Sequence, residues 1–397
     1  MSAWAETTLK KVAEKISYGY TASATEQNTG VKFLRITDIA SGPIDWDTVP
    51  YCEISETDIE KCGLSEGEIV IARTGATVGY AKQIRRNPPH SVFASYLVRV
   101  RLKDNVCKRF VGILTESDNY KYYINTIAGG SAQPNANAQD LCSYPFYLPP
   151  IHVQQKLVAI LSAYDELIEN NQRRIALLEK MGEEIYREWF VRLRFLGHEK
   201  VKKVKGVPDG WRDQKFGQFC QLQRGFDLTD ADVESGPYPV IASTSIKTYH
   251  SQYKVEPPVI TTGRSGSLGE VLFVNTRAWP HNTALYVKKF FGNSAFLVYY
   301  TLKNMRLENF NAGAGVPTLN RNHLNGIPII VPSKEIQDQF DGVVSILHAQ
   351  AELLRNANQK LTMTRDSLLP RLISGKLSVE NLDIQFPPNM EEPVHET

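Results

Sequence analysis

The sequence predicts an α+β protein built from two similar modules of mixed, strand-rich structure, each followed by a long helix, with the two helices packed on each other. Two observations lead to this prediction: an internal repeat, and an apolar heptad pattern after each copy of it. They divide the 397 residues into a first module at 1–150, a first long helix at 151–196, a linker at 197–210, a second module at 211–333, a second long helix at 334–375 and a C-terminal tail at 376–397.

The internal repeat consists of residues in the first half of the chain that match residues in the second half. The difference between the two residue numbers, the offset, decreases along the chain. Trp4 aligns with Trp211 at an offset of 207, and Arg73 aligns with Arg264 at an offset of 191. The falling offset indicates that the second copy is shorter inside the module, whereas the end of the module is retained. Five matches share the final offset of 183: Pro134, Leu141, Pro145, Pro149 and Gln154 correspond to Pro317, Leu324, Pro328, Pro332 and Gln337.

Each module combines short apolar runs with turn residues. The runs at 67–72 and 95–100 predict strands, because they are rich in β-branched residues and end at turn residues. The segments 120–127 and 296–307 predict helices. Each module ends in a loop rich in Gly, Asn and Pro, at 129–137 and at 313–320.

After each module, apolar residues recur at alternating spacings of four and three, which is typical of a coiled coil. A helix of about 45 residues is roughly 65 Å long at 1.5 Å per residue, too long to pack on one small module. We therefore expect the two helices to pack on each other, and separate burial of two amphipathic helices is the alternative. The first seam is Leu157, Leu161, Tyr164, Ile168, Asn171, Ile175, Leu178, Gly182, Ile185 and Trp189, and the second is Phe340, Val344, Leu347, Ala351, Leu354, Asn358, Leu361, Arg365, Leu368 and Leu372.

Composition indicates a cytoplasmic protein. No apolar run reaches the roughly 18 residues that a membrane span needs, and the N-terminal segment lacks the apolar core of a signal peptide. The five cysteines form no CxxC pair, so neither a disulfide framework nor a zinc site is indicated.

The charge distribution gives modest support for a nucleic-acid partner. The net charge is +2, but residues 211–333 carry 12 basic and 8 acidic side chains, whereas 334–397 carry 6 and 10. A basic second module suits a DNA backbone, although an ordinary mixed surface also explains it. The lysines of the linker 197–210 are interpreted as a solvated segment, with a DNA-backbone contact as the alternative.

Two motifs carry a resemblance to a known family. Residues 148–157, Leu-Pro-Pro-Ile-His-Val-Gln-Gln-Lys-Leu, lead into the first helix, and residues 368–377, Leu-Leu-Pro-Arg-Leu-Ile-Ser-Gly-Lys-Leu, end the second. Together with the repeated Arg-Ser/Thr-Gly turn and Gly-rich loop, they make nearly the whole chain similar to the specificity subunit of a type I restriction–modification system.

The resemblance implies that each module is a target recognition domain that reads one half of a split DNA sequence. The two helices would form an antiparallel spacer and a docking surface for two methyltransferase subunits. Those subunits would use S-adenosylmethionine to methylate adenine, and restriction (motor-nuclease) subunits would act on unmodified DNA. The chain itself would choose the site, with no catalytic residue, cofactor or metal ion of its own.

Two other classes of function are left open. One is a self-contained DNA adenine methyltransferase, because Asn87-Pro88-Pro89-His90 is one residue short of the Pro-Pro-aromatic loop that such enzymes use to hold a flipped base. No Gly-rich cofactor loop follows a strand upstream, so we expect this segment to form a turn. The other is a coiled-coil scaffold without DNA recognition.

Candidate DNA contacts lie in the two turns and in the two loops. Arginine can bind guanine through two hydrogen bonds, Asn and Gln can pair with adenine, and glycine lets the backbone approach a phosphate. The alternatives are a hairpin turn with a surface arginine, and amides that cap turns. The candidates are Arg35, Thr37, Arg73, Thr74, Gln133, Asn135 and Asn137 in the first module, and Ser243, Thr244, Arg264, Ser265, Asn320 and Arg321 in the second.

Each seam contains one asparagine, and these two predict the helix registry. If the helices overlap in antiparallel orientation so that Leu157 faces Leu372, the residue numbers of each facing pair add up to 529. Asn171 then faces Asn358. A lone asparagine in a seam is desolvated without a partner, whereas two in one layer can hydrogen-bond and fix the alignment. The alternative is that one or both face solvent or a methyltransferase subunit. Pro370 is expected to kink or stop the second helix.

Overall fold

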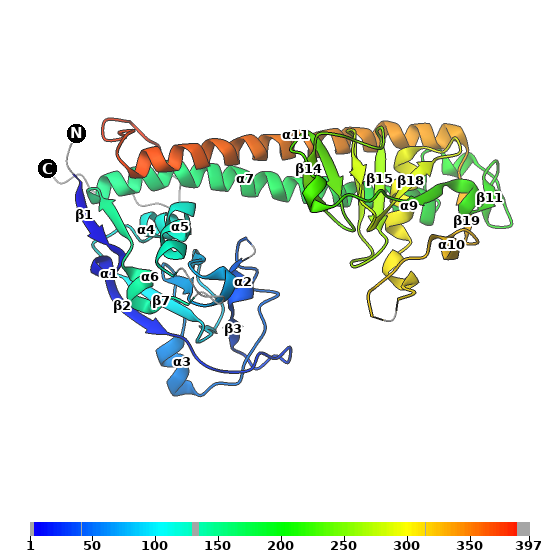
Figure 1. The fold of residues 1–397 in the computed structure, drawn as a ribbon. Helices are drawn as coiled ribbons and strands as arrows, with labels where there is room; N and C mark the ends of the chain where they lie inside the picture. The colour runs from blue at the N-terminus through cyan, green and yellow to red at the C-terminus, as the bar shows by residue number, and fades with distance from the viewer. Residues whose placement is uncertain (1–3, 41, 129–134, 314, 387–397) are drawn as a thin grey trace. The chain divides into compact units, whose positions relative to one another are not determined.

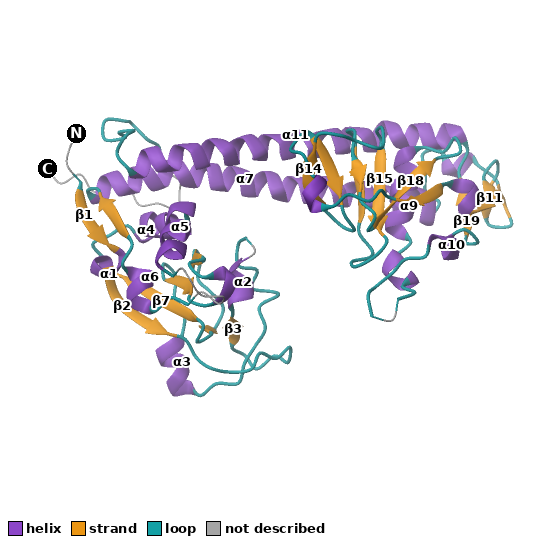
Figure 2. Ribbon diagram, viewed as in Figure 1, coloured by secondary structure: helices purple, strands orange, loops and turns teal. Residues whose placement is uncertain are grey.

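The structure is a computed structural model that describes residues 4–40, 42–128, 135–313 and 315–386. The chain divides into two compact units. The first contains Met1–Glu169 and Gln359–Thr397, and the second contains Asn170–Asn358. Each unit therefore holds one strand-rich module and a stretch of both long helices, which confirms the predicted α+β fold class (Figures 1 and 2).

The first module is built on a four-stranded antiparallel sheet. Its strand order is β2 (Ala13–Tyr18), β7 (Leu97–Leu102), β4 (Ile69–Ala72) and β5 (Ala81–Gln83). A separate parallel pair joins β3 (Lys32–Leu34) to β6 (Ser91–Phe93). The other elements of this module are β1 (Ala5–Thr8), α1 (Leu9–Val12), α2 (Ile36–Ala40), α3 (Glu56–Cys62), the 3₁₀ turn η1 (Gly75–Thr77), α4 (Lys108–Glu116), α5 (Asp118–Ile127), α6 (Ala138–Cys142) and β8 (Pro145–Leu148).

Strand β4 is apolar throughout because both of its faces are covered. Ile69 and Ile71 pack in the core that also contains residues of α4 and α5, whereas Val70 and Ala72 pack in a second core on the other face. All four side chains are buried. An uninterrupted apolar run is the pattern expected for a strand between two covered faces.

The second module repeats this arrangement. Its four-stranded antiparallel sheet has the order β12 (Gln221–Arg224), β18 (Ala284–Lys289), β15 (Val259–Gly263) and β16 (Val271–Val274). A second sheet pairs β13 (Tyr238–Ile241) with β14 (Ile246–His250) and, in parallel, with β17 (Trp279–Pro280). The other elements are η3 (His198–Lys200), β9 (Lys203–Val204), β10 (Val207–Pro208), β11 (Arg212–Lys215), α8 (Phe216–Phe219), η4 (Asp230–Asp232), α9 (Ala295–Asn304), η5 (Leu307–Phe310), α10 (Arg321–Leu324) and β19 (Pro328–Val331).

The two modules end in the same way. Strands β1 and β8 pair with Ala5 opposite Leu148, and β11 and β19 pair with Arg212 opposite Val331. These pairs are related by the offsets of 207 and 183 that the sequence shows. The repeat is therefore present in the strand register as well as in the residues.

A buried glutamine fastens the first turn of each long helix to its module. The Gln154 Oε1 atom accepts a hydrogen bond from the Cys107 backbone N–H at 2.9 Å, and Nε2 donates to the Pro149 carbonyl at 2.7 Å. Gln337 does the same with the N–H of Ser294 at 2.8 Å and the carbonyl of Pro332 at 3.0 Å. Because a buried amide needs both kinds of partner, glutamine is retained at this position in both copies.

The long helices α7 (Ile151–Tyr186) and α11 (Lys334–Ile373) pack antiparallel. In the first unit, Leu157 and Leu372 share one core, and in the second unit the rings of Trp189 and Phe340 lie 5.9 Å apart. In both pairs the residue numbers add up to 529, as expected for the predicted antiparallel overlap. Each helix thus contributes to the core of both units.

Both helices end earlier than the sequence suggests. Helix α7 ends at Tyr186 and continues as a π turn, η2 (Arg187–Val191), so the expected helix to residue 196 is wrong for residues 192–196. Leu193 then takes a positive φ of 57°, and the chain folds back so that Phe195 enters the core of the second unit. Helix α11 continues through Pro370 for three residues and ends at Ile373, so the proline does not stop it at once.

The second module packs on the helices through aromatic rings. The Tyr300 hydroxyl on α9 is 2.9 Å from His348 Nε2 on α11. On α7, a Cβ at Gly182 would lie 1.9 Å from the same hydroxyl, so only glycine leaves room for this tyrosine. Phe273 and Phe296 stack at 4.8 Å, and His348 lies against both rings.

This packing makes the second unit sensitive to acid. Burial, together with the positive charges of Arg355 and Lys303, lowers the pKa of His348 to about 4. In the unfolded chain a histidine has a pKa near 6.5, so the unfolded state gains a proton first as the pH falls. The stability that neutral His348 contributes is complete above about pH 6.5 and is lost as the pH falls towards 4.

We predict that the free energy of unfolding of the second unit falls by up to about 3 kcal/mol more in the native protein than in His348→Gln between pH 7 and pH 4. Urea unfolding at both pH values measures this difference. His323→Gln is the control, because His323 is exposed. The prediction is wrong if His348→Gln loses as much stability on acidification as the native protein does.

Candidate nucleic-acid interface

In the first module, the Arg73 turn and the end of the Gly/Asn/Pro loop lie side by side. The turn connects β4 to η1, and the Arg73 backbone N–H donates to the Tyr96 carbonyl at 3.1 Å. The Arg73 carbonyl accepts from the Ala136 N–H at 2.9 Å, and Thr74 forms a β-bridge with Asn135. The structure thus brings together Arg73, Thr74 and Asn135, three of the candidate residues.

One tyrosine ring lies against the Arg73 side chain, and a second tyrosine accepts a hydrogen bond from the Arg73 main chain. Its guanidinium carbon lies 5.0 Å from the centre of the Tyr18 ring, and its buried Nε has no hydrogen-bond partner among the residues that the structure describes. Tyr18 is 47% exposed and Tyr96 is 61% exposed. Sequence reasoning missed both tyrosines, because nothing in their spacing separates them from tyrosines in the core. An arginine stacked on an accessible tyrosine is a suitable surface for nucleic acid.

The second module repeats the main-chain arrangement of this turn. The Arg264 N–H donates to the Thr283 carbonyl at 2.8 Å, and the Arg264 carbonyl accepts from the Leu319 N–H at 2.8 Å. Ser265 forms a β-bridge with Thr318, as Thr74 does with Asn135. The two turns therefore share one backbone frame.

The side chains on the second frame differ from those on the first. Arg264 Nε donates to the Asn282 carbonyl at 3.0 Å, instead of lying over a ring. The Ser243 hydroxyl donates to the Ser265 carbonyl at 2.5 Å, so these candidates also lie together. Thr244 is half-buried beside Ser243 in the chain. The two modules present different chemistry at equivalent places.

The two loop asparagines at offset 183 are helix caps. Asn137 Oδ1 accepts from the N–H groups of Gln139 at 2.8 Å and Asp140 at 2.9 Å, at the start of α6. Asn320 Oδ1 accepts from the Asn322 N–H at 3.0 Å, at the start of α10. The side-chain oxygens of both residues therefore cap helices, as the alternative interpretation expected, and only their amide nitrogens are left to contact a base.

The remaining candidates are engaged elsewhere or lie outside the described residues. Arg35 binds the Asp38 carboxylate through Nε at 3.1 Å and Nη2 at 2.9 Å, and this hydrogen bonding raises the pKa of Arg35. Thr37 is exposed on α2. Arg321 donates to a main-chain carbonyl of β12 at 3.2 Å. Gln133 lies outside the described residues.

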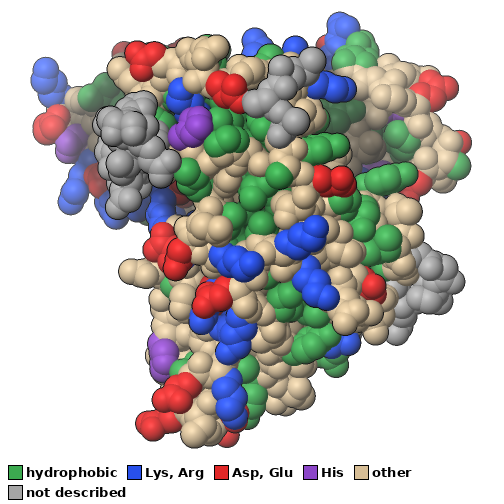
Figure 3. Space-filling view, turned by 90° about the vertical axis from the view of Figure 1, so that its left-hand side faces the viewer, with side chains coloured by type: hydrophobic (Ala, Val, Ile, Leu, Met, Phe, Trp, Pro, Cys, Tyr) green, Lys and Arg blue, Asp and Glu red, His purple; other side chains and the backbone are tan. Residues whose placement is uncertain are grey.

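Charges of both signs share the surface of the first module. Lys and Arg side chains are interspersed with Asp and Glu on the face shown in Figure 3. This agrees with residues 1–150, which carry 16 basic and 16 acidic side chains. The linker hairpin of β9 and β10 exposes its lysines. Recognition of a polyanion by the first module would therefore depend on where single side chains lie, and not on a uniform positive field.

The described residues provide neither a metal site nor a membrane-spanning helix. Among the described residues, no cluster of three or more His, Cys, Asp and Glu side chains could hold a metal ion. Within the same residues, no helix is both long enough and apolar enough to cross a membrane.

Comparisons with known proteins agree with one another. A family model for the type I restriction modification DNA specificity domain matches residues 1–180 and 208–363. The MjaIX specificity subunit of Methanocaldococcus jannaschii, a type I restriction enzyme subunit, is 24% identical over 366 residues, which cover 83% of this chain and 82% of that protein. The EcoKI specificity subunit of Escherichia coli is 22% identical over 170 residues, or 40% of this chain and 36% of that protein.

A solved structure has a similar fold. The crystal structure of a type I restriction–modification S subunit from M. genitalium matches with a TM-score of 0.55 at 17% identity, over 93% of this chain and 96% of that one. At this identity the match concerns the fold alone.

Proposed function

The chain belongs to the family of type I restriction–modification specificity subunits, and we propose that it binds DNA by reading one short sequence with each module. The observation that carries this proposal is the pair of turns around Arg73 and Arg264, which share a backbone frame but differ in side chains. One frame with two sets of side chains is what a reader of two unlike half-sites needs. The base contacts proposed are those of the arginines, with Thr74, Asn135, Ser243 and Ser265 beside them.

The long helices are proposed to act as a spacer. Helix α7 has 36 residues, which corresponds to about 54 Å at 1.5 Å per residue. One turn of duplex DNA is roughly 34 Å, so a helix of this length suits half-sites separated by a fixed gap. A rigid spacer would make the target bipartite, with unread base pairs between its halves.

The Asn171–Asn358 pair is proposed to fix the registry of this spacer. Asn171 Nδ2 donates to Asn358 Oδ1 at 2.8 Å, and Asn171 is only 4% exposed. A shift of either helix by one heptad would separate the two asparagines, and Asn171 would then face Arg365 or Ala351 instead of an amide. Such a buried, unpaired amide costs roughly 1–3 kcal/mol, which disfavours other alignments.

Exposed apolar side chains on the helices support docking of methyltransferase subunits. In the second unit, five large apolar side chains of α7 and α11 are 36–69% exposed. They lie beside the seam and not in it, so packing of the two helices does not explain them. Large exposed apolar patches mark protein interfaces. The residues are Leu177, Met181, Val343, Ile346 and Leu353.

The chain is proposed to be non-catalytic and cytoplasmic, in a complex with two methyltransferase subunits that bind S-adenosylmethionine and with restriction subunits. The Asn87-Pro88-Pro89-His90 segment lies in the loop between β5 and β6, where the His90 carbonyl accepts from the Lys32 N–H at 2.9 Å. It therefore serves as a connection that leads into a paired strand. A self-contained methyltransferase is the alternative.

Selection from random duplexes tests the proposed function. The purified chain, alone and with its methyltransferase subunits, is expected to enrich two unlike short sequences at one fixed separation. Calorimetry with S-adenosylmethionine is expected to show no binding to the chain alone. Enrichment of a single continuous sequence would contradict recognition of a bipartite target. Tight binding of S-adenosylmethionine would favour a self-contained methyltransferase.

Single substitutions in the turns should act on one half-site each. Arg73→Ala is expected to weaken base discrimination in one half-site, and Arg264→Ala in the other, by about 1–3 kcal/mol per position. Competition binding against single-base variants of the selected target measures this. Arg277→Ala is the control for loss of a charge, because Arg277 is a surface residue paired with Glu256. Equal loss of affinity for all sequences would mean that the two arginines contact phosphate.

A further inference from the structure

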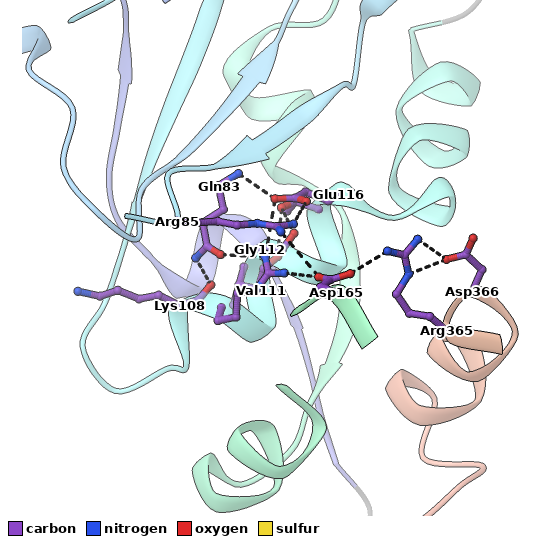
Figure 4. Close-up of polar contacts among 11 residues, drawn as sticks. Gln83, Arg85, Lys108, Val111, Gly112, Glu116, Asp165, Arg365 and Asp366 are labelled. Carbon is purple, nitrogen blue, oxygen red and sulfur yellow. Dashed lines mark hydrogen bonds and ion pairs between the residues drawn. The ribbon is translucent and has the colours of Figure 1, made fainter. Parts of the chain in front are cut away.

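One carboxylate of the first unit links the module to both long helices. Asp165 on α7 receives a hydrogen bond from Arg109 Nη2 on α4 at 2.9 Å, through its Oδ2 atom. Its Oδ1 atom receives another from Arg365 Nη1 on α11 at 2.7 Å. Figure 4 shows Asp165 between the module and α11. Both oxygens are thus used, one towards the module and one towards the partner helix.

A second carboxylate extends this network into the sheet. Glu116 accepts the Gln83 backbone N–H of β5 at 3.0 Å and Arg85 Nη2 at 2.7 Å. Arg85 and Arg109 also lie within ion-pair distance of the other carboxylate, with Arg85 Nη1 3.7 Å from Asp165 and Arg109 Nη1 3.9 Å from Glu116 (Figure 4). A continuous path of charged contacts therefore runs from β5 through α4 to α7 and α11.

Four members of the network are shielded from solvent, whereas Arg85 is 46% exposed. The side chains of Arg109, Glu116, Asp165 and Arg365 are 14–30% exposed. Hydrogen-bonded ion pairs at partly buried sites are directional and are screened less by salt than fully exposed pairs. Loss of one partner leaves the others desolvated without compensation.

The second unit shows that the fold does not require charges here. Asp165 corresponds to His348 at offset 183, and Arg109 corresponds to Phe296 at offset 187, the offset between Cys107 and Ser294 at the start of α4 and α9. The same place in the second unit is filled by stacked rings. Because ring packing and one hydrogen bond, from Tyr300 to His348, occupy the equivalent place, the carboxylate between two arginines in the first unit calls for its own explanation.

We propose that Asp165 is a positioning residue that sets the orientation of the first module on the helix pair, and through it the gap between half-sites that the protein accepts. The inference rests on the proposed function. The ring contacts around His348 have little directionality, and a single hydrogen bond, between Tyr300 and His348, orients that junction. An aspartate held by two arginines on different elements defines one geometry, so it ties the angle of α4 to the alignment of α7 and α11.

Asp165→Asn tests this role, with Asp366→Asn as its matched control. The asparagine keeps the shape of the side chain but removes the charge that both arginines bind. Asp366 pairs with Arg365 and is 58% exposed, so its loss leaves the Asp165 contacts in place. The selected target is compared with versions whose gap is one base pair longer or shorter. Asp165→Asn is expected to reduce the preference for the native gap on the order of tenfold, with base discrimination inside each half-site unchanged.

A measurement without DNA separates this inference from the proposed function. Spin labels at Tyr122→Cys on α5 and Met363→Cys on α11, both exposed in the first unit, report the distance from the module to the helix. The distance distribution is expected to broaden in Asp165→Asn and to stay narrow in Asp366→Asn. Arg365→Gln removes the contact between Asp165 and α11, along with the Arg365–Asp366 pair that the control also removes, and leaves the Arg109–Asp165 contact in place. It should give an intermediate width and replaces Asp165→Asn if that variant fails to fold.

The outcomes then decide the matter. A narrow distribution in Asp165→Asn and Arg365→Gln would overturn the positioning role, whatever the DNA assay shows. A broad distribution with an unchanged gap preference would overturn the link to the gap. Failure of the native chain to select any bipartite target would refute the proposed function and, with it, the gap claim, while the label distances would still report on the network.

Discussion

The antiparallel packing of α7 and α11 is the interaction on which both compact units depend. Each unit contains a stretch of both helices, so neither core is complete with one of them. The seam is mostly apolar and would tolerate sliding by a heptad, because one apolar layer resembles the next. We propose that the partly buried Asn171–Asn358 hydrogen bond breaks this equivalence, since only one alignment brings the two amides together.

The two modules show which parts of a repeated fold are set by the backbone and which by side chains. The buried Gln154 and Gln337 make the same two hydrogen bonds to main-chain groups, which every sequence supplies. The turns at Arg73 and Arg264 likewise share main-chain partners. Where contacts are between side chains, the copies differ, with ions around Asp165 and rings around His348. The side chains of a module can thus vary without loss of its backbone frame.

Much of the fold could be predicted from the periodicity of the sequence, because periodicity depends only on residues that are near each other in the chain or in equivalent positions of the repeat. The repeat offsets predict the equivalent strand pairs, and the heptads predict two long helices and the layer that holds the two asparagines. The early end of α7 was not predicted, because it depends on Phe195 entering the core of the second unit. Proline has no backbone N–H and so cannot make the helix hydrogen bond expected at its position. Pro370 lies only three residues before the end of α11, so only a short stretch of helix follows this missing bond.

The candidate site was only partly predictable, because sequence patterns are local and some of its contacts join distant segments. Motif spacing found the two arginine turns and their neighbouring loops, which are close in the repeat. It missed Tyr18, whose contact with Arg73 joins distant segments, and Asp165, whose partner Arg365 is 200 residues away. It also could not tell an asparagine that caps a helix, such as Asn137, from one that is free to contact a base.

Engineered cross-linking tests the central claim, the registry of the two helices, most directly. Ile175 and Leu354 occupy the layer next to the asparagines, with the facing sum of 529. Cysteines at Ile175 and Leu354 are predicted to form a disulfide readily under mild oxidation, because facing seam positions approach the spacing that a disulfide needs. Cysteines at Ile175 and Leu347, one heptad or about 10 Å away along the axis, should remain reduced. Efficient cross-linking of the second pair, or of both pairs alike, would contradict a single fixed registry.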